Sequence, residues 1–171
     1  MSKPRLYLFI GYPGAGKTTV ALHIAAKSDA VHLWADRERL KMFGKPTHSA
    51  TESHQLYDHL NQVAADLLAQ GRSVIFDTNF NLLKDRRHLR EIADQAGAET
   101  ITIWVTTPRE LAEHRAIADT AAQPTRLLGD MTPGEFERIA SHLEPPTEDE
   151  KVLKFDGTEL DIEALERELG L

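Results

Sequence analysis

The stretch Gly11-Tyr12-Pro13-Gly14-Ala15-Gly16-Lys17-Thr18 has the spacing Gly-x-x-x-x-Gly-Lys-Thr, which is typical of a phosphate-binding loop (P-loop). An apolar run, Leu6–Ile10, precedes it, and a helical pattern from Thr19 to Lys27 follows. Glycine lets the backbone wrap an anion without Cβ clashes, and the N-terminus of a helix attracts negative charge. Because strand and helix both flank the loop, a phosphate site is favoured over a chance match in a glycine-bearing turn.

The side chains of this loop have separate expected roles. The backbone of residues 11–19, which includes Thr19, is expected to enclose the phosphates of a nucleotide. Lys17 is expected to bridge the outer phosphates, and the hydroxyl of Thr18 to bind Mg2+. The loop therefore predicts a site for a nucleoside triphosphate with magnesium.

Length and composition predict one globular domain that spans residues 1–171. The net charge of −7 argues against a broadly cationic surface that binds nucleic acid non-specifically, and the lack of cysteine excludes disulfides and thiolate metal sites. Met1–Pro4 is too short and too polar for a signal peptide, and no apolar run reaches membrane-spanning length. A cytoplasmic protein without membrane contact is expected.

Strand and helix patterns alternate along the chain. Such alternation predicts an α/β fold with a mostly parallel sheet covered by helices on both faces. After the first strand at 6–10, the expected strands are Val31–Trp34, Ser73–Asp77, Ile101–Val105 and Val152–Phe155.

Two capping boxes with proline at the first helical position are expected to start helices, Thr107-Pro108-Arg109-Glu110 and Thr132-Pro133-Gly134-Glu135. Between them, residues 114–131 begin as a helix and are then interrupted by a proline and a glycine. This segment carries Arg115 and Arg126 and is a candidate lid. An arginine that moves over the phosphates would stabilise the transition state, although each could also be a surface residue.

Two aspartates follow predicted strands. Asp77 ends the third strand and is expected to hold Mg2+, although a strand-end turn residue would also fit. The next residue is Thr78 rather than glutamate, which argues against an ATPase motor. Asp36 lies two residues beyond Trp34 and is expected to accept a proton from a substrate hydroxyl, or to cap the following helix, or both.

Further polar residues lie near these aspartates. Arg39 is placed to contact an anionic substrate, or is a charge on a solvated face; Thr78 and Asn79 are expected to line the substrate site. The basic run formed by Lys84, Arg86, Arg87 and Arg90 is interpreted as a solvated helix face, or as one wall of a groove for a phosphorylated polymer. The eight histidines show no metal-ligand spacing and are interpreted as surface or local-packing residues.

With these residues in place, the chain resembles the small P-loop kinases of the AAA_33 group. That group is related to the polynucleotide 5′-hydroxyl kinase domain and, more distantly, to zeta-toxin and chloramphenicol phosphotransferase kinases. The resemblance covers most of residues 5–158. It rests on the P-loop, Asp36 with Arg39, Val74–Asn81, the pair Arg86-Arg87, and Glu110-Leu111 through Arg115.

The resemblance to polynucleotide kinases implies that Asp36 is the general base, that Arg39 contacts a substrate phosphate, and that Arg115 belongs to the lid. This chain departs from them at three positions. Ala35 stands where they tend to have arginine, and Arg37 replaces a second aspartate. Their second lid arginine falls at Asp119, so Arg126 would have to act from a different place.

Together these features predict a single-domain P-loop kinase with a five-stranded parallel sheet in the order 2-3-1-4-5 and a helical lid. ATP and Mg2+ are the expected cofactors, and ATP is preferred to GTP because no Asn-Lys-x-Asp motif is found. The acceptor is expected to be a nucleic-acid 5′-hydroxyl or a small alcohol. The alternatives are a nucleotide-binding regulator or weak ATPase, and a toxin-type kinase of sugar nucleotides.

Overall fold

The computed structural model describes residues 2–118, 125–129 and 131–171. At its centre is a five-stranded sheet in the order β2-β3-β1-β4-β5, in which every pair of neighbours is parallel. The fold class and strand order predicted from the sequence are thereby confirmed. The strands are β1 (Arg5–Ile10), β2 (Val31–Trp34), β3 (Val74–Asp77), β4 (Glu99–Val105) and β5 (Val152–Phe155).

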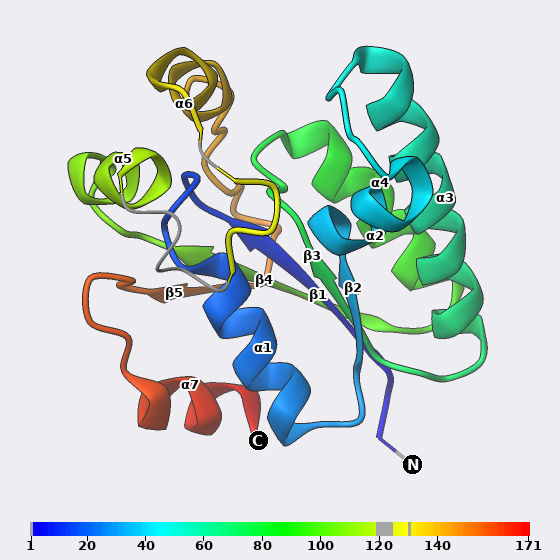
Figure 1. Ribbon diagram of the computed structural model, residues 1–171. Helices are drawn as coiled ribbons and strands as arrows, with labels where there is room; N and C mark the ends of the chain where they lie inside the picture. The colour runs from blue at the N-terminus through cyan, green and yellow to red at the C-terminus, as the bar shows by residue number, and fades with distance from the viewer. Residues whose placement is uncertain (1, 119–124, 130) are drawn as a thin grey trace.

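Helices connect these strands and cover the sheet on both faces (Figure 1). None of the described helices is long and apolar enough to cross a lipid bilayer. The helices are α1 (Lys17–Lys27), α2 (Ala35–Phe43), α3 (Ala50–Ala69), α4 (Leu83–Gln95), α5 (Arg109–Ile117), α6 (Pro133–Ala140) and α7 (Ile162–Leu169).

The two faces of the sheet form separate hydrophobic clusters. On one face, Leu6, Leu8 and Phe76 pack against α3 and α4 through side chains such as Leu60 and Leu89. The opposite face packs against α1 and α7 and is formed mainly by Phe9, Ile75, Ile103, Ile24 and Leu165. Strands buried on both faces have continuous apolar sequences, which explains why β1 and β3 could be recognised from the sequence.

The carboxyl ends of the central strands lie at one edge of the sheet, where the P-loop follows β1. Trp34 at the end of β2 is in register with Asp77 at the end of β3. Helix α2 begins directly after Trp34, which is its N-cap, so Asp36 lies within the first turn. The expectation that Asp36 caps this helix is therefore wrong. A carboxylate in the first turn is nevertheless favoured by the helix dipole.

The second predicted capping box is confirmed, because the side chains of Thr132 and Glu135 each accept a backbone N–H at the start of α6. The first is wrong: Pro108 is the N-cap of α5, with no side-chain cap, and the Thr107 hydroxyl donates to the P-loop instead. The predicted lid at residues 114–131 includes residues 119–124 and 130, which lie outside the described residues. Asp119, the position of the second lid arginine in polynucleotide kinases, is one of them.

The predicted basic run is solvated only in part, because Lys84 and Arg87 are exposed whereas Arg86 is buried. Arg86 is only 2% exposed, and its Nε pairs with Glu150 at 2.6 Å. Its Nη1 donates to the carbonyl oxygens of Phe80 and Asn81, and its Nη2 to those of Glu144 and Pro145. Its guanidinium therefore joins the loop after β3 to the segment after α6. Arg90, one turn later, pairs with Asp149.

We predict that Arg86→Met lowers the free energy of unfolding by about 3–5 kcal/mol, because it leaves the Glu150 carboxylate buried without its partner. Arg87→Met, at the exposed neighbouring position, is the matched control and should change it by no more than about 0.5 kcal/mol. Urea denaturation followed by circular dichroism measures both. Equal effects of the two substitutions would show that the buried ion pair does not have this role.

Candidate functional site

The backbone conformation of the P-loop depends on its glycines and on close packing against α5. Gly16 precedes α1 with φ 110°, a left-handed conformation that favours glycine. Gly14 also has positive φ, and a Cβ there would lie 2.2 Å from the carbonyl oxygen of Ala112. Any larger residue at Gly14 would force the loop and α5 apart.

Lys17 folds back across this loop. Its ammonium donates to the carbonyl oxygens of Gly11 at 2.8 Å and Tyr12 at 2.7 Å. These carbonyls satisfy two of its three N–H donors without neutralising its charge.

Burial lowers the pKa of Lys17 from its usual 10.5 to about 8. The carboxylates of Asp77 and Asp36 oppose this effect, and the positive charge of Arg126 adds to it. The charge of Lys17 therefore interacts with three other expected site residues, namely Asp77, Asp36 and Arg126. A phosphate placed against the ammonium would supply the negative charge that the carbonyls cannot.

Asn81 fixes the start of the P-loop. Its amide oxygen accepts the N–H of Gly11 at 3.0 Å, and its amide nitrogen donates to the carbonyl of the same residue at 3.1 Å. Asn81 is 1% exposed, and its own carbonyl accepts from Arg86. The loop thus depends on a buried amide that the sequence showed only as part of the Val74–Asn81 resemblance.

The segment after β5 closes on the other side of the P-loop. A Cβ at Gly157 would lie 2.2 Å from the carbonyl oxygen of Ala15 and 2.1 Å from the hydroxyl of Thr107. That hydroxyl already donates to Ala15 at 2.6 Å. Gly157 is therefore required by a close backbone approach, and the sequence alone did not indicate this.

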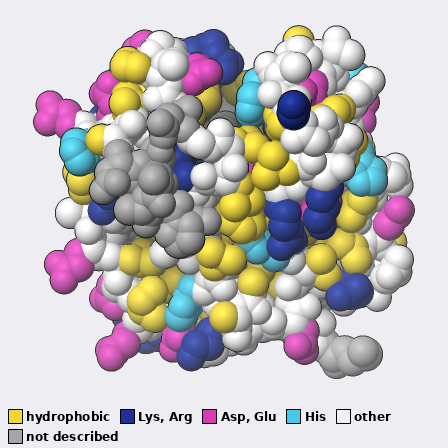
Figure 2. Space-filling view, in the orientation of Figure 1, with side chains coloured by type: hydrophobic (Ala, Val, Ile, Leu, Met, Phe, Trp, Pro, Cys, Tyr) yellow, Lys and Arg dark blue, Asp and Glu magenta, His cyan; other side chains and the backbone are white. Residues whose placement is uncertain are grey.

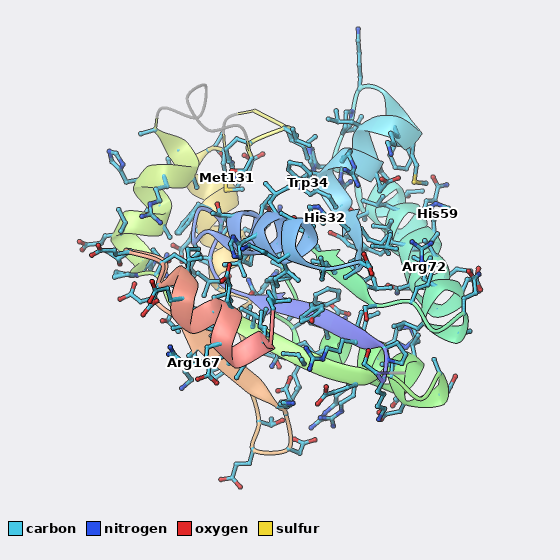
Figure 3. The ribbon with its side chains drawn as sticks, turned by 90° about the horizontal axis from the view of Figure 1, so that it is seen from below. His32, Trp34, His59, Arg72, Met131 and Arg167 are labelled. Carbon is cyan, nitrogen blue, oxygen red and sulfur yellow. The ribbon has the colours of Figure 1, made fainter. Side chains whose placement is uncertain are left out.

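Asp77 and Thr18 lie together as expected for a magnesium site. The Thr18 hydroxyl donates to one carboxylate oxygen of Asp77 at 3.1 Å. The second oxygen lies 2.9 Å from Nε2 of His32, whose ring stacks on Trp34 (Figure 3). Hydroxyl and carboxylate oxygens are the ligands that Mg2+ prefers, so these two residues fit the ion. His32 positions the carboxylate, a role that the sequence interpretation of the histidines missed.

Asp36 lies across the cleft from the P-loop. Burial, and then the nearby charge of Asp77, raise the pKa of Asp36 above its usual 3.8. The positive charges of Arg126 and Arg39, and the His48 side chain, partly oppose the shift. A carboxylate with a raised pKa is a better proton acceptor, which suits a general base.

Arg39 is buried in a local network. It donates to Glu52 at 2.7 Å and to the hydroxyl of Ser53 at 3.2 Å. Glu52 also accepts the backbone N–H groups of Thr47 and His48. Burial opposes ionisation of Glu52, but these bonds outweigh it and lower its pKa to about 2. Arg39 is therefore not a charge on a solvated face, and its contact with an anionic substrate stays a prediction.

A cleft of about 1380 Å³ connects these features. In the space-filling view the surface is hollowed between the lobe that carries α6 and the segment at the start of α3 (Figure 2). The predicted site residues that line it are Pro13, Gly14, Gly16, Lys17, Thr18, Thr19, Asp36, Arg39, Asp77, Thr78, Asn79, Arg115 and Arg126.

Three loop residues do not line this cleft. Gly11 and Ala15 are buried behind it, and Tyr12 lies 6.2 Å from the ring of Phe136 on α6. Their place is structural, as part of the backbone that shapes the loop.

The two predicted lid arginines occupy different places. Arg115 donates to the carbonyl oxygens of Gly157 at 2.8 Å and Thr158 at 3.4 Å, so it tethers the segment after β5. Arg126 donates to the carbonyl of Ala116 at 3.3 Å, while its buried Nε has no partner among the described residues. The positive charge of Arg126 acts on both Lys17 and Asp36.

Known proteins share the sequence pattern and the fold of this chain. A model of the AAA_33 family, described as an AAA domain, matches residues 6–146. No curated protein is similar enough in sequence to count as a relative.

Solved structures share the fold. A protein from Chloroflexus aurantiacus assigned to the kinases is 23% identical, with a TM-score of 0.78 and coverage of 99% of this chain and 96% of its own. The APS kinase CysC of Mycobacterium tuberculosis is 17% identical, with a TM-score of 0.68 and coverage of 99% and 98%. A chain of the Pnkp1/Rnl/Hen1 RNA repair complex is 22% identical, with a TM-score of 0.69 and coverage of 84% and 45%.

We predict that nucleotide binding is coupled to proton uptake by Lys17. With a pKa of about 8, roughly three quarters of the free lysine is neutral at pH 8.5, and an adjacent phosphate would restore its proton. Calorimetric titration with ATP in buffers of different ionisation enthalpy should show uptake of most of one proton at pH 8.5.

Lys17→Arg is the control, because arginine keeps its charge at this pH. It should abolish this uptake, and the difference between the two proteins should vanish at pH 6.5, where the wild-type lysine is already protonated. Equal proton uptake by both proteins at pH 8.5 would contradict the depressed pKa of Lys17.

Proposed function

The chain belongs to the AAA_33 group of P-loop kinases, and we propose that it transfers the γ-phosphate of ATP, bound with Mg2+, to a hydroxyl group of an acceptor. The observation that carries the proposal is the position of Asp36. This carboxylate lines the same cleft as the P-loop, is influenced by both Asp77 and Arg126, and has a raised pKa. The proposed acceptor is either a nucleic-acid 5′-hydroxyl or a small alcohol.

In the proposed reaction, the acceptor oxygen attacks the γ-phosphorus while its proton passes to the carboxylate of Asp36. A bond forms between that oxygen and phosphorus, and the bond from phosphorus to the bridging oxygen breaks, so that ADP leaves. The P-loop backbone binds the phosphates, and Lys17 exchanges its carbonyl partners for them. Mg2+, held by Thr18 and Asp77, would neutralise charge on the phosphates.

Arg126 is proposed to stabilise charge on the transferred phosphoryl group. Its buried Nε lacks a described partner, and its charge already reaches Lys17 and Asp36. Arg115 is assigned a separate role, because its bonds to Gly157 and Thr158 hold the segment that closes over Ala15. Of the predicted lid arginines, Arg126 is therefore the catalytic candidate and Arg115 the positioning residue.

We predict that Asp36→Ala lowers kcat for phosphoryl transfer by about 10²–10⁴-fold, because the acceptor loses its proton acceptor. The affinity for ATP should remain within a few-fold of wild type, since the P-loop is unchanged. Transfer of γ-labelled phosphate and calorimetric ATP binding give the two quantities.

Asp94→Ala, at an exposed position of α4 outside the cleft, is the control and should leave both quantities unchanged. A nucleotide-binding regulator or weak ATPase would instead keep its slow hydrolysis after Asp36→Ala. If the only product is free phosphate, and its rate is the same in both proteins, the kinase proposal fails. A toxin-type sugar-nucleotide kinase would be indicated by growth arrest on expression that Lys17→Ala relieves.

We predict that Arg126→Ala lowers kcat by roughly 10²–10³-fold, the effect of removing one donor from a charged transition state. Arg115→Ala should act mainly on ATP affinity, because it releases the segment at Gly157. Arg72→Ala, at an exposed position, is the control. Steady-state kinetics separate the effects on kcat from those on KM. A larger loss of kcat in Arg115→Ala than in Arg126→Ala would reverse the assignment.

A further inference from the structure

One side of the cleft determines which acceptor fits. We call it the acceptor wall, and it consists of the lining residues from 36–61, 78–89 and 135–142. Among the described residues, its arginine and lysine side chains are Arg39 and Arg138. Lys17, Arg115 and Arg126 line the opposite, nucleotide side. An anionic acceptor would therefore have to be bound by Arg39 and Arg138.

Arg39 does not offer an unbalanced positive charge. Its guanidinium is 6% exposed and is paired with Glu52, which is itself 6% exposed. Glu52 is fixed in turn by three hydrogen bonds from Thr47 and His48. Both terminal nitrogens of the Arg39 guanidinium thus have partners inside the protein, so an acceptor phosphate would compete with Glu52 and Ser53 for them.

Arg138 is exposed on α6 and lies one turn after Glu135. Hydrogen bonds from Thr132 are the main cause that lowers the pKa of the Glu135 carboxyl, and the charge of Arg138 adds to the shift. Arg138 therefore brings one positive charge to the wall, close to the negative charge of Glu135.

The carboxylates on the wall outnumber its arginines. Asp36, Asp58 and Asp85 line it in addition to Glu135. Asp58 lies 3.2 Å from the ring nitrogen of His54, whereas Asp36 and Asp85 form no ion pair with the described residues. Uncharged hydrogen-bonding groups lie among them. The Tyr57 hydroxyl is within 2.8 Å of that of Thr78, and Asn61 and Asn79 present amides.

We propose that the acceptor is an uncharged small molecule with several hydroxyl groups, not a phosphorylated or carboxylated compound or a nucleic-acid end. This inference rests on the proposed function. An anionic acceptor would meet the carboxylates of the wall and the triphosphate together, whereas hydroxyl groups can exchange hydrogen bonds with tyrosine, threonine, asparagine and aspartate side chains.

The basic run on α4 offers only part of its charge to a nucleic acid. Arg86 is paired with Glu150 and Arg90 with Asp149, so two of its four positive charges are balanced. The net charge of −7 also opposes binding of a nucleic-acid phosphate backbone.

The test uses the intact protein, Mg-ATP labelled at the γ-phosphate, and a nucleotide-free extract of small metabolites. Ion exchange divides the extract into neutral, cationic and anionic pools, and a 5′-hydroxyl DNA oligonucleotide is assayed beside them. Labelled product is expected from the neutral pool at a rate at least tenfold above that from any other acceptor. The purified neutral acceptor is then compared with its carboxylated or phosphorylated counterpart.

Glu52→Gln tests the cause of this selectivity, because it removes the charge that balances Arg39 while keeping an amide oxygen as an acceptor. It should raise kcat/KM for the anionic counterpart relative to the neutral acceptor at least tenfold. Glu91→Gln, on an exposed part of α4, should leave the ratio unchanged. The double variant Arg39→Gln with Glu52→Gln removes both charges and should retain the wild-type preference; thermal melting verifies that each variant is folded.

Preferential labelling of the anionic or cationic pool, or of the oligonucleotide, would overturn this inference and leave the kinase proposal intact. The same holds if folded Glu52→Gln does not change the ratio. Release of free phosphate alone, at a rate that Asp36→Ala leaves unchanged, would overturn the kinase proposal and the inference with it.

Discussion

A lysine ammonium buried among carbonyl oxygens is the constraint on which the site depends. Lys17 has two backbone carbonyls as partners, and no carboxylate of the described residues lies within hydrogen-bonding distance of its ammonium. Among these residues, the carboxylates of Asp77 and Asp36 act on its charge from further away. Burial lowers its pKa, and this arrangement makes the loop complementary to an anion. Asn81 and Gly157 hold the loop from two sides, and neither tolerates much change, because one is a buried paired amide and the other touches backbone.

Two buried arginines near the cleft are paired with glutamates, which makes the polarity of the cleft asymmetric. Arg39 with Glu52 and Arg86 with Glu150 each join segments that are distant in the sequence. A buried ion pair of this kind contributes little net stability, since desolvation offsets much of the attraction, but loss of one partner is costly. Positive charge available to a phosphate is therefore concentrated on the nucleotide side. The acceptor wall has mainly carboxylates and neutral polar groups.

Much of this could be predicted from the sequence. Continuous apolar strands, glycines at fixed spacing and alternation of elements give the sheet order and the P-loop, since these features are local. The first capping box failed because Thr107 finds a better partner in Ala15, which is distant in the chain. The burial of Arg86, the pairing of His32 with Asp77 and the neutralisation of Arg39 are equally non-local. An arginine in a helical pattern gives no sign of a glutamate 64 residues away.

The central claim is that the terminal phosphate of ATP goes to a hydroxyl group through Asp36. Phosphorus NMR of a complete reaction measures this directly, because it separates inorganic phosphate from a phosphate ester. With the neutral metabolite pool present, the account predicts that ATP consumption is matched by a new phosphate-ester signal and that Asp36→Ala suppresses it. Inorganic phosphate as the sole product, formed equally by both proteins, would contradict the account.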